Sequence, residues 1–190
     1  MARTYTLRRR GERQAETRQR IAQAAMELHG TVGPARTSLS MVAERAGVQR
    51  NTLYAHFPDE RSLFQACSGL FIERNPPPDM TSWRAEPAGP ARLGTGLTAV
   101  YRWYDANAEM MSCVLRDAEH HALTRETSEA SFGPLVAAWR AVLGEGLSAA
   151  QLPLLHLALS FHSWRALVRE AGLTVDAAAA TMARAITSAA

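Results

Sequence analysis

The chain has 190 residues, of which 47% are hydrophobic and 21% are charged. This composition excludes a disordered tail and supplies enough apolar material for a core, while the length suits one small domain joined to a larger one. The formal charge of +3 is uneven, because residues 1–74 hold 12 arginines against 7 acidic residues and residues 75–190 hold 9 against 11. We therefore expect an anionic partner for the N-terminal part.

Basic side chains dominate the first residues, which we assign to an N-terminal arm over residues 1–12. The arm contains Arg3, Arg8, Arg9 and Arg10 and almost no apolar side chains. One interpretation is an arm that reaches phosphates or a neighbouring minor groove. The alternative is a solvated tail that acts only through its charge.

Residues 38–57 hold two short amphipathic helical patterns joined by a turn. The first pattern places its apolar residues at i, i+3, i+4 and i+7, on one helical face: Leu39, Val42, Ala43 and Ala46. Ser38 is placed to cap this helix, and Gly47 can adopt the positive φ that ends it. Leu53 and Phe57 supply the inner face of the second helix. This layout predicts a helix-turn-helix.

The outward face of the second helix carries side chains that suit base edges and phosphates in a major groove. They are Gln49, Arg50, Asn51, Thr52, Tyr54 and His56. Arg50 suits guanine and Asn51 suits adenine, although either residue can instead bind phosphate. For His56, a capping or packing role is the alternative. Thr37 and Ser38 are predicted phosphate contacts at the start of the first helix.

These motifs and their flanks resemble the TetR family, the tetracycline-repressor type of DNA-binding protein. Upstream, the run TRQRI at residues 17–21, with apolar residues continuing to Leu28, is similar to the first helix of that family. Downstream, the run TLYAHF at residues 52–57, followed by Leu63 and Phe64, resembles the third helix running into the fourth. The resemblance covers roughly residues 13–72, and several elements recur in order at fixed spacing.

Two residues depart from the family pattern. The family commonly has glycine where Asn51 stands, and a phosphate-binding lysine where Glu60 stands. The adjacent Arg61 is our candidate to replace that lysine. We therefore add Arg61 to the predicted DNA contacts.

A Pro-rich linker is predicted over residues 75–90, which contain five prolines and little periodicity. It separates a DNA-binding domain over residues 13–74 from a body over residues 91–190. The body is patterned as helices near 91–107, 109–121, 128–144, 149–171 and 174–188, with Ser148 and Thr174 as candidate caps. The predicted fold is all-α, a three-helix helix-turn-helix head joined to a helical bundle. The resemblance implies that this body binds a ligand and dimerises.

Large aromatic and soft side chains are concentrated in the body. They are Trp103, Tyr104, Met110, Met111, Trp139, Phe161, His162 and Trp164. One hypothesis is a mostly apolar cavity that binds a small molecule, with Tyr104, His162 or a tryptophan N–H group as its polar contacts. The alternative is that these residues simply fill the core.

The last two helices, about residues 149–188, are the predicted homodimer interface. Their apolar residues are Leu152, Leu155, Leu159, Ala166, Val175, Ala178, Ala179, Met182, Ala183 and Ile186. Two such helices from each subunit form a four-helix bundle across a two-fold axis, and the alternative is burial within one subunit. A homodimer would read palindromic double-stranded DNA. Our hypothesis is a repressor that a small-molecule ligand releases from its DNA site. Repression is implied only by the resemblance, because most members of the family are repressors.

Other functions have weaker support. His120, His121, His156 and His162 lack the spacing of a metal or acid–base site, and the sequence contains no nucleophile elbow or phosphate-binding loop. We therefore expect no catalysis, metal or cofactor, with a helical enzyme as a remote alternative. A DNA-binding regulator without an inducer is the closer alternative.

The cellular setting is inferred from cysteine use and hydropathy. Cys67 and Cys113 form no CxxC pair, the sequence shows no secretory signal, and apolar stretches break before the roughly 20 residues that a membrane span requires. We expect a cytoplasmic protein with no membrane partner. Cys67 lies on an apolar helix face, where packing is one interpretation and a redox-sensing thiol is the other.

Overall fold

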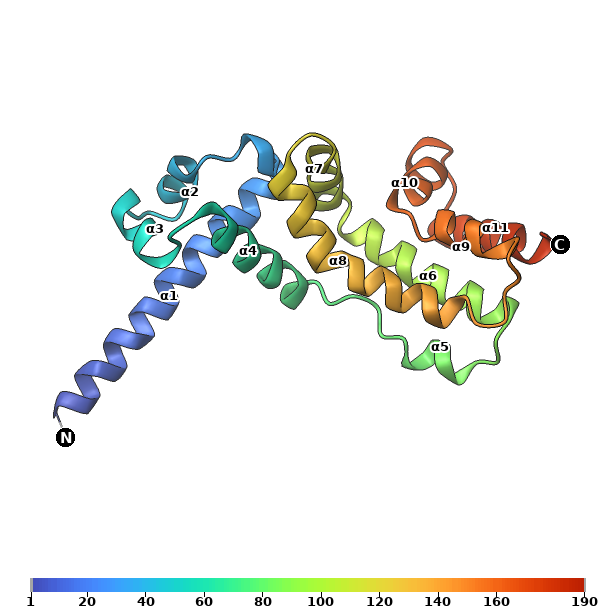
Figure 1. The fold of residues 1–190 in the computed structure, drawn as a ribbon, viewed down its shortest axis with the longest axis horizontal. Helices are drawn as coiled ribbons and strands as arrows, with labels where there is room; N and C mark the ends of the chain where they lie inside the picture. The colour runs from blue at the N-terminus through green and yellow to red at the C-terminus, as the bar shows by residue number, and fades with distance from the viewer. Residues whose placement is uncertain (1, 190) are drawn as a thin grey trace. The chain divides into compact units, whose positions relative to one another are not determined.

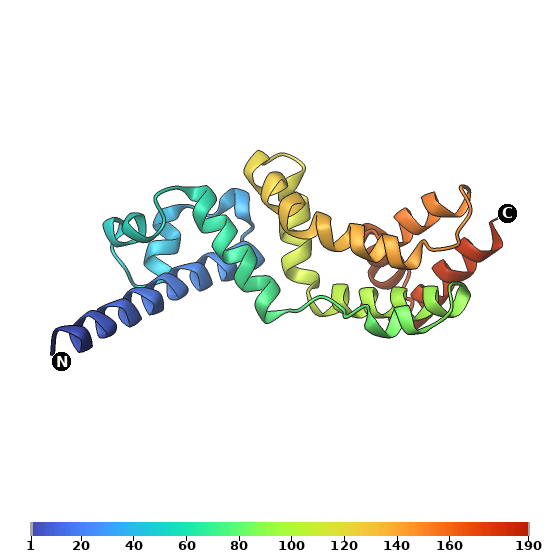
Figure 2. The ribbon, with the colours of Figure 1, turned by 60° about the horizontal axis from the view of Figure 1, so that its bottom comes forward.

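The computed structural model describes the backbone of residues 2–189 and the side chains of residues 9–189. Within this range all regular secondary structure is helical, which confirms the predicted all-α class (Figures 1 and 2). The chain divides into two compact units. The head unit contains residues 1–75 and 112–131, and the body unit contains residues 76–111 and 132–190. No helix of the described chain is long and apolar enough to cross a bilayer.

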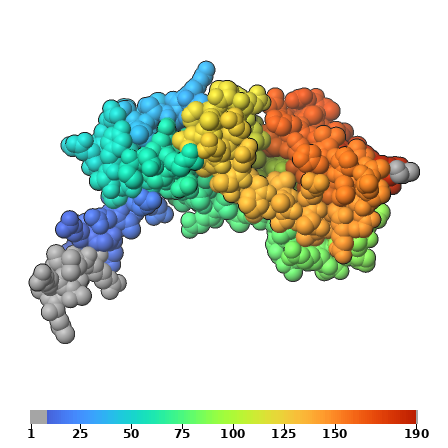
Figure 3. Space-filling view, viewed as in Figure 1, coloured from blue at the N-terminus to red at the C-terminus, as the bar shows by residue number. Residues whose placement is uncertain are grey.

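Four helices and a short 3-10 turn build most of the head unit. They are α1 (Ala2–Thr31), η1 (Pro34–Arg36), α2 (Leu39–Arg45), α3 (Arg50–His56) and α4 (Glu60–Arg74). α1 packs against α4 and α2, and α2 packs against α3. From residue 9 onward, the part of α1 that precedes the core residue Ile21 extends beyond the other three helices (Figures 1 and 3). From Ala2 onward, the residues of the predicted arm therefore form the first turns of α1.

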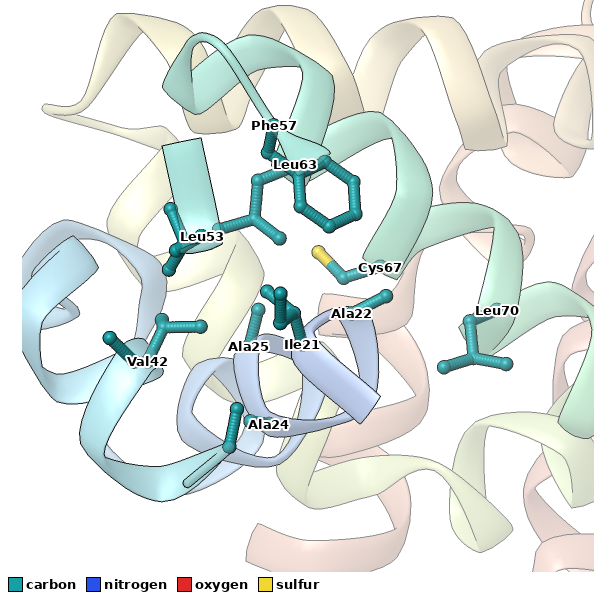
Figure 4. Close-up of a cluster of buried hydrophobic side chains, with 12 residues drawn as sticks. Ile21, Ala22, Ala24, Ala25, Val42, Leu53, Phe57, Leu63, Cys67 and Leu70 are labelled. Atoms are coloured by element: carbon teal, nitrogen blue, oxygen red, sulfur yellow. The ribbon is translucent and has the colours of Figure 1, made fainter. Parts of the chain in front are cut away.

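The core of the head unit lies where these four helices meet. Figure 4 shows its side chains, which include Ile21, Ala24, Ala25, Val42, Leu53, Phe57, Leu63, Cys67 and Leu70. The predicted inner face of α2 is buried at Val42, Ala43 and Ala46 and half-buried at Leu39. Burial also raises the pKa of the Cys67 thiol to about 12, so this thiol stays protonated. That environment favours the packing role of Cys67 over a redox role.

Local chemistry sets the boundaries of the helix-turn-helix. The Ser38 hydroxyl accepts a hydrogen bond from the backbone N–H of Met41 at 3.3 Å, which caps α2 as predicted. Beyond α2, Gly47 has φ +63°, a value that costs glycine little because it has no Cβ. The chain then enters α3, which has Gln49 as its N-cap residue.

The head unit also contains the end of α7 (Ala108–Ala118) and the start of α8 (Ala122–Leu143). Asp117 on α7 is 2% exposed and accepts a hydrogen bond from the backbone N–H of Ala35 at 2.9 Å. The Cys113 thiol donates to the carbonyl of Gly30 at 3.4 Å. These contacts join residues 112–131 to the end of α1 and to η1. The sequence had assigned the same residues to the body.

The body unit consists of the rest of α7 and α8 and of six further elements. These are α5 (Thr81–Ala85), α6 (Pro90–Ala106), α9 (Gln151–Ala158), α10 (Phe161–Trp164), the π-helical turn η2 (Arg165–Glu170) and α11 (Val175–Ser188). α11 packs mainly against α6 and also against α9. The short α5 lies inside the predicted linker, and its Trp83 is 1% exposed. The linker is thus partly helical and anchored by a buried ring.

Two predicted helices of the body differ from the observed ones. The predicted helix over residues 149–171 is broken between α9 and α10, because Ser160 has an extended backbone and its hydroxyl accepts from the backbone N–H of His162 at 3.2 Å. Serine competes in this way with the helical hydrogen bonds. α8 begins at Ala122 rather than near residue 128 and continues through Pro134. Thr174 caps α11 as predicted, accepting from the backbone N–H of Ala177 at 3.2 Å.

Candidate nucleic-acid interface

α3 presents a polar face to solvent and an apolar face to the head core. Leu53 and Phe57 are 1% and 0% exposed, which anchors the helix from inside. The predicted contacts Gln49, Arg50, Asn51 and Tyr54 are exposed, and Thr52 and His56 are half-buried. Six predicted side chains therefore lie on or beside a helix whose outward face is available to a partner.

Arg50 and Tyr54 form a pair on that outward face. They are one helical turn apart, and the Arg50 Nη2 donates to the Tyr54 hydroxyl at 3.2 Å. The Arg50 guanidinium carbon lies 5.8 Å from the centre of the Tyr54 ring. The tyrosine O–H and the remaining guanidinium N–H groups stay able to donate. The pair therefore supplies donors of a kind that acceptors on base edges and phosphates require.

Arg18 on α1 fixes the end of α3. Its guanidinium carbon lies 4.0 Å from the centre of the Phe57 ring, and its Nη1 donates to the backbone carbonyl of His56. A cation stacked on the ring and bonded to the last carbonyl of a helix holds that helix against its neighbour. From the sequence, Arg18 was placed only within the first helix. The i, i+3 spacing of Arg18 from Ile21 gave no sign of its contact with Phe57 and His56.

Thr37 and Ser38 have different surroundings at the start of α2. Ser38 is exposed, and because its oxygen acts as the cap acceptor, its O–H can still donate to a phosphate. Thr37 is 7% exposed, and its hydroxyl donates to the carbonyl of Gly33 at 2.8 Å. This geometry favours a phosphate contact from Ser38 and not from the Thr37 side chain, which instead closes the turn before α2.

The start of α4 carries acidic residues where Arg61 was expected to bind phosphate. Asp59 caps the helix by accepting from the backbone N–H of Ser62 at 2.7 Å, and this hydrogen bond lowers the pKa of the Asp59 carboxyl. Arg61 Nη2 lies 2.7 Å from Glu126 Oε2 on α8, with both side chains more than half exposed. A phosphate at Arg61 would have to replace Glu126.

A cavity of about 430 Å³ lies between the N-terminal part of α1 and α3. We call it the basic groove; it is lined by Arg9, Arg10, Arg13, Gln14, Thr17, Thr52 and His56. Thr52 and His56 were predicted DNA contacts, whereas Gln14 and Thr17 were not. Their spacing from Arg10 along a helix is the signal that could have identified them.

The comparison with protein families agrees with this geometry. Residues 21–67 match the family described as bacterial regulatory proteins of the tetR family. That range contains the last third of α1, all of α2 and α3, and the first half of α4. Over these residues the head resembles the TetR family. The match lies in the head, and it contains the whole helix-turn-helix.

Two curated relatives are similar to part of this chain. The HTH-type transcriptional regulator AcrR of Shigella flexneri is 45% identical over 49 residues, which are 26% of this chain and 23% of AcrR. The HTH-type transcriptional regulator TtgR of Pseudomonas putida is 43% identical over 60 residues, which are 32% of this chain and 29% of TtgR. The matches thus span less than a third of either relative.

Solved structures extend the similarity of fold to most of the chain. A transcriptional regulator from Rhodococcus sp. Rha1 has a TM-score of 0.62 and 17% identity, covering 89% of this chain and 95% of that one. Salmonella enterica GusR has a TM-score of 0.63 and 19% identity, covering 90% and 95%. At this identity the likeness concerns the fold alone.

The body unit gathers five of the eight predicted ligand-binding residues into one aromatic cluster. Its members are Trp103, Tyr104, Trp139, Phe161 and Trp164, each at most 7% exposed. The Tyr104 ring lies within 6.4 Å of the other four ring centres. Met111 is also buried and Met110 is half-buried on α7. His162 is exposed, because α10 turns it away from the cluster.

Two polar atoms of this aromatic core have no hydrogen-bond partner within the part of the chain that the structure describes. They are the hydroxyl of Tyr101, 0% exposed, and the indole Nε1 of Trp164, 1% exposed. The Tyr104 hydroxyl, in contrast, donates to the carbonyl of Leu159 at 2.7 Å. Sequence reasoning missed Tyr101, although Leu97, Val100, Tyr101 and Tyr104 occur at i, i+3, i+4 and i+7. Of the predicted polar contacts, the Tyr104 hydroxyl is thus already bonded and His162 is exposed, whereas the N–H group of Trp164, one of the predicted tryptophans, is buried and unbonded within the described residues.

Most of the predicted dimer face is buried within the subunit itself. Ala178, Ala179, Ala183 and Ile186 of α11 are at most 8% exposed, because α11 packs against α6 and α9. Leu155 and Leu159 are buried as well. Val175, Met182 and Leu152 remain half-buried. On α9, Leu157 is 52% exposed, and the only other large apolar side chain exposed in residues 9–189 is Tyr54.

Proposed function

We propose that this chain is a DNA-binding transcriptional repressor that binds a palindromic operator as a homodimer and is released by a small, mostly apolar ligand. The observation that carries the proposal is the anchored α3, which holds Arg50, Asn51 and Tyr54 outward while Leu53 and Phe57 fix it from inside. In a helix-turn-helix, the second helix reads base edges from the major groove. The family match over residues 21–67 supports the same role.

The homodimer is supported by the size of α3 and by Leu157. A helix of seven residues covers one half-site, and two copies related by a two-fold axis read a palindrome. Leu157 is the exposed aliphatic residue that a partner subunit would cover. Because α11 already packs inside its own subunit, we place the interface on the solvent side of α9 and α11.

The ligand is supported by the aromatic core of the body unit. A buried polar group that lacks a partner costs about 1–3 kcal/mol, so the Tyr101 hydroxyl and the Trp164 N–H favour a molecule that carries acceptors. The neighbouring rings of Tyr104 and Phe161 suit a ligand that is itself apolar and aromatic. We therefore propose an uncharged aromatic molecule with one or two oxygen acceptors.

Selection of bound sequences from a random duplex pool, at near-physiological salt, tests the DNA part. We expect a palindromic motif from the purified chain. If binding occurs without any motif and collapses with added salt, the head is only an electrostatic anchor and the repressor proposal fails. Transcription from a promoter that carries the selected site would then separate repression from activation.

Titration of the operator complex with uncharged aromatic compounds tests the ligand part. All four tryptophans lie in the body unit, so their fluorescence reports ligand binding there and not in the head. We expect a compound that changes this fluorescence to release the operator, and Tyr101→Phe to weaken its binding. An operator complex that no such compound dissociates would favour the regulator without an inducer.

A further inference from the structure

The N-terminal part of α1 aligns four polar side chains on one helical face. Arg10, Arg13, Gln14 and Thr17 occur at i, i+3, i+4 and i+7, and all four line the basic groove. The opposite wall is formed by Thr52 and His56 of α3. The groove therefore borders α3, the helix that we propose to read bases. The helical form of α1 fixes which of its side chains line the groove.

The chemistry of the groove suits phosphate. Three arginines line it, with an amide and two hydroxyl groups as further donors, and no carboxylate is among its lining residues. Among residues 9–189, no carboxylate forms an ion pair with Arg10 or Arg13. Arginine N–H groups, threonine hydroxyls and amides are the groups that bind the DNA backbone in protein–DNA complexes.

We propose that the basic groove binds backbone phosphates of the operator duplex, as a second contact beside the base-reading face of α3. The proposal rests on the proposed function, because it takes duplex DNA as the occupant. Two arguments favour DNA over a free anion. The groove shares Thr52 and His56 with α3, and its arginines are exposed along a helix rather than enclosed around a single ion.

The groove requires an ordered helix, which separates it from a charged tail. α1 runs without interruption from Ala2 to Thr31, although Gly11 lies inside it. Glycine weakens a helix interior, and a Cβ at Gly11 would meet nothing within 4 Å. Residue 11 can therefore be changed to make this part of α1 more or less helical without altering its charge.

The first test compares Arg10→Gln/Arg13→Gln with Arg84→Gln/Arg140→Gln, a control that removes the same charge from exposed positions of the body unit. Affinity for the selected operator is measured between 50 mM and 200 mM salt. The slope of log affinity against log salt concentration becomes less steep by about 1.8 when two phosphate contacts are lost. Between the two salt concentrations, the fall in affinity of the groove variant should therefore be about tenfold smaller than the fall in affinity of wild type. The control should keep the wild-type slope. Equal slopes for the two double variants would overturn the proposal.

The second test leaves the charge unchanged. Gly11→Pro breaks α1 at the groove and should weaken operator binding, whereas Gly11→Ala should strengthen it by about two- to fivefold, since alanine favours a helix over glycine. Ethylation of single phosphates should interfere with wild type at positions where Gly11→Pro is insensitive. If Gly11→Pro binds like wild type, the arginines act only as diffuse charge. Failure of wild type to select any operator would instead overturn the proposed function.

Discussion

At the residue scale, Arg61 and Glu126 form an ion pair that competes with any phosphate at the start of α4. The two side chains meet at 2.7 Å and are 56% and 51% exposed, so the pair contributes little to stability. Glu126→Gln should therefore free Arg61 and strengthen operator binding. Because exposed pairs are worth about 0.2–1 kcal/mol, we expect a gain of up to about fivefold in affinity at low salt, measured by fluorescence anisotropy.

Two controls separate this exchange from a general effect of charge. Glu129→Gln removes an exposed carboxylate from the same helix and should change affinity less. In the Arg61→Gln background, Glu126→Gln should bring no gain. A gain of the same size in that background would show that Arg61 binds no phosphate.

His29 makes the stability of the head unit depend on pH. Its ring is 5% exposed, lies 4.6 Å from the Phe64 ring between centroids, and has its Nδ1 at 3.4 Å from the Cys67 thiol. Burial lowers its pKa from 6.5 to about 4, while the nearby Asp117 raises that pKa and His121 lowers it. The folded head thus favours the neutral ring. The resulting stabilisation is complete above about pH 6.5 and is lost as the pH falls towards 4.

We expect this loss to reach about 2 kcal/mol between pH 7 and pH 5, since one pKa unit corresponds to about 1.4 kcal/mol. Urea unfolding followed by circular dichroism reports both units, and tryptophan fluorescence reports the body unit. The transition seen only by circular dichroism therefore belongs to the head. Between pH 7 and pH 5, the urea midpoint of this transition should fall less in His29→Phe than in wild type. Equal falls of the midpoint in the two proteins would contradict the role of His29.

At the element scale, local sequence patterns predicted where the helices lie, whereas long-range contacts determine which helices pack against one another. Leu39 and Val42 recur at helical spacing, and Ser38 and Gly47 mark the ends of α2, so its bounds were visible in the sequence. The contact between Asp117 and the Ala35 backbone crosses 82 residues and leaves no periodic trace. The assignment of residues 112–131 to the head therefore required the structure.

The hydrogen bond from Ala35 to Asp117 ties η1 to α7, and η1 precedes the start of α2. Arg116 donates to Asp117 at 2.8 Å, and a Cβ at Gly33 would overlap both side chains. Asp117→Ala leaves the Ala35 N–H without its acceptor and should destabilise the head by about 1 kcal/mol or more. We also expect weaker operator binding, because Ser38 loses its fixed position.

Asp117→Asn is the matched variant, since its amide oxygen can still accept from Ala35. It should retain more operator affinity than Asp117→Ala. Neither change should alter the tryptophan fluorescence, which arises in the body unit. Wild-type operator affinity in Asp117→Ala would show that the position of α2 does not depend on α7.

At the scale of the whole molecule, the candidate site was easier to predict in the head than in the body. The predicted base contacts Gln49–His56 occur within eight consecutive positions, where i, i+3 and i+4 spacing separates the outer face of α3 from the inner one. The aromatic cluster joins α6, α8 and α10, so Tyr101 could be distinguished from ordinary core residues only by its unpaired hydroxyl. In the same way, the apolar face of α11 gave no sign of whether α6 or a second subunit would cover it.

Leu157 tests whether the second subunit is needed. Fully burying a leucine contributes about 1.5–3 kcal/mol, and a two-fold interface buries it twice, so Leu157→Arg should raise the dimer dissociation constant by at least about a hundredfold. Ala106→Arg places the same charge on another exposed position of the body unit and serves as control. Sedimentation should show monomers only for Leu157→Arg, and its affinity for the palindrome should fall while its affinity for a half-site stays unchanged. A dimeric Leu157→Arg would place the interface elsewhere, whereas a monomer that binds the palindrome as tightly as wild type would remove dimerisation from the proposed function.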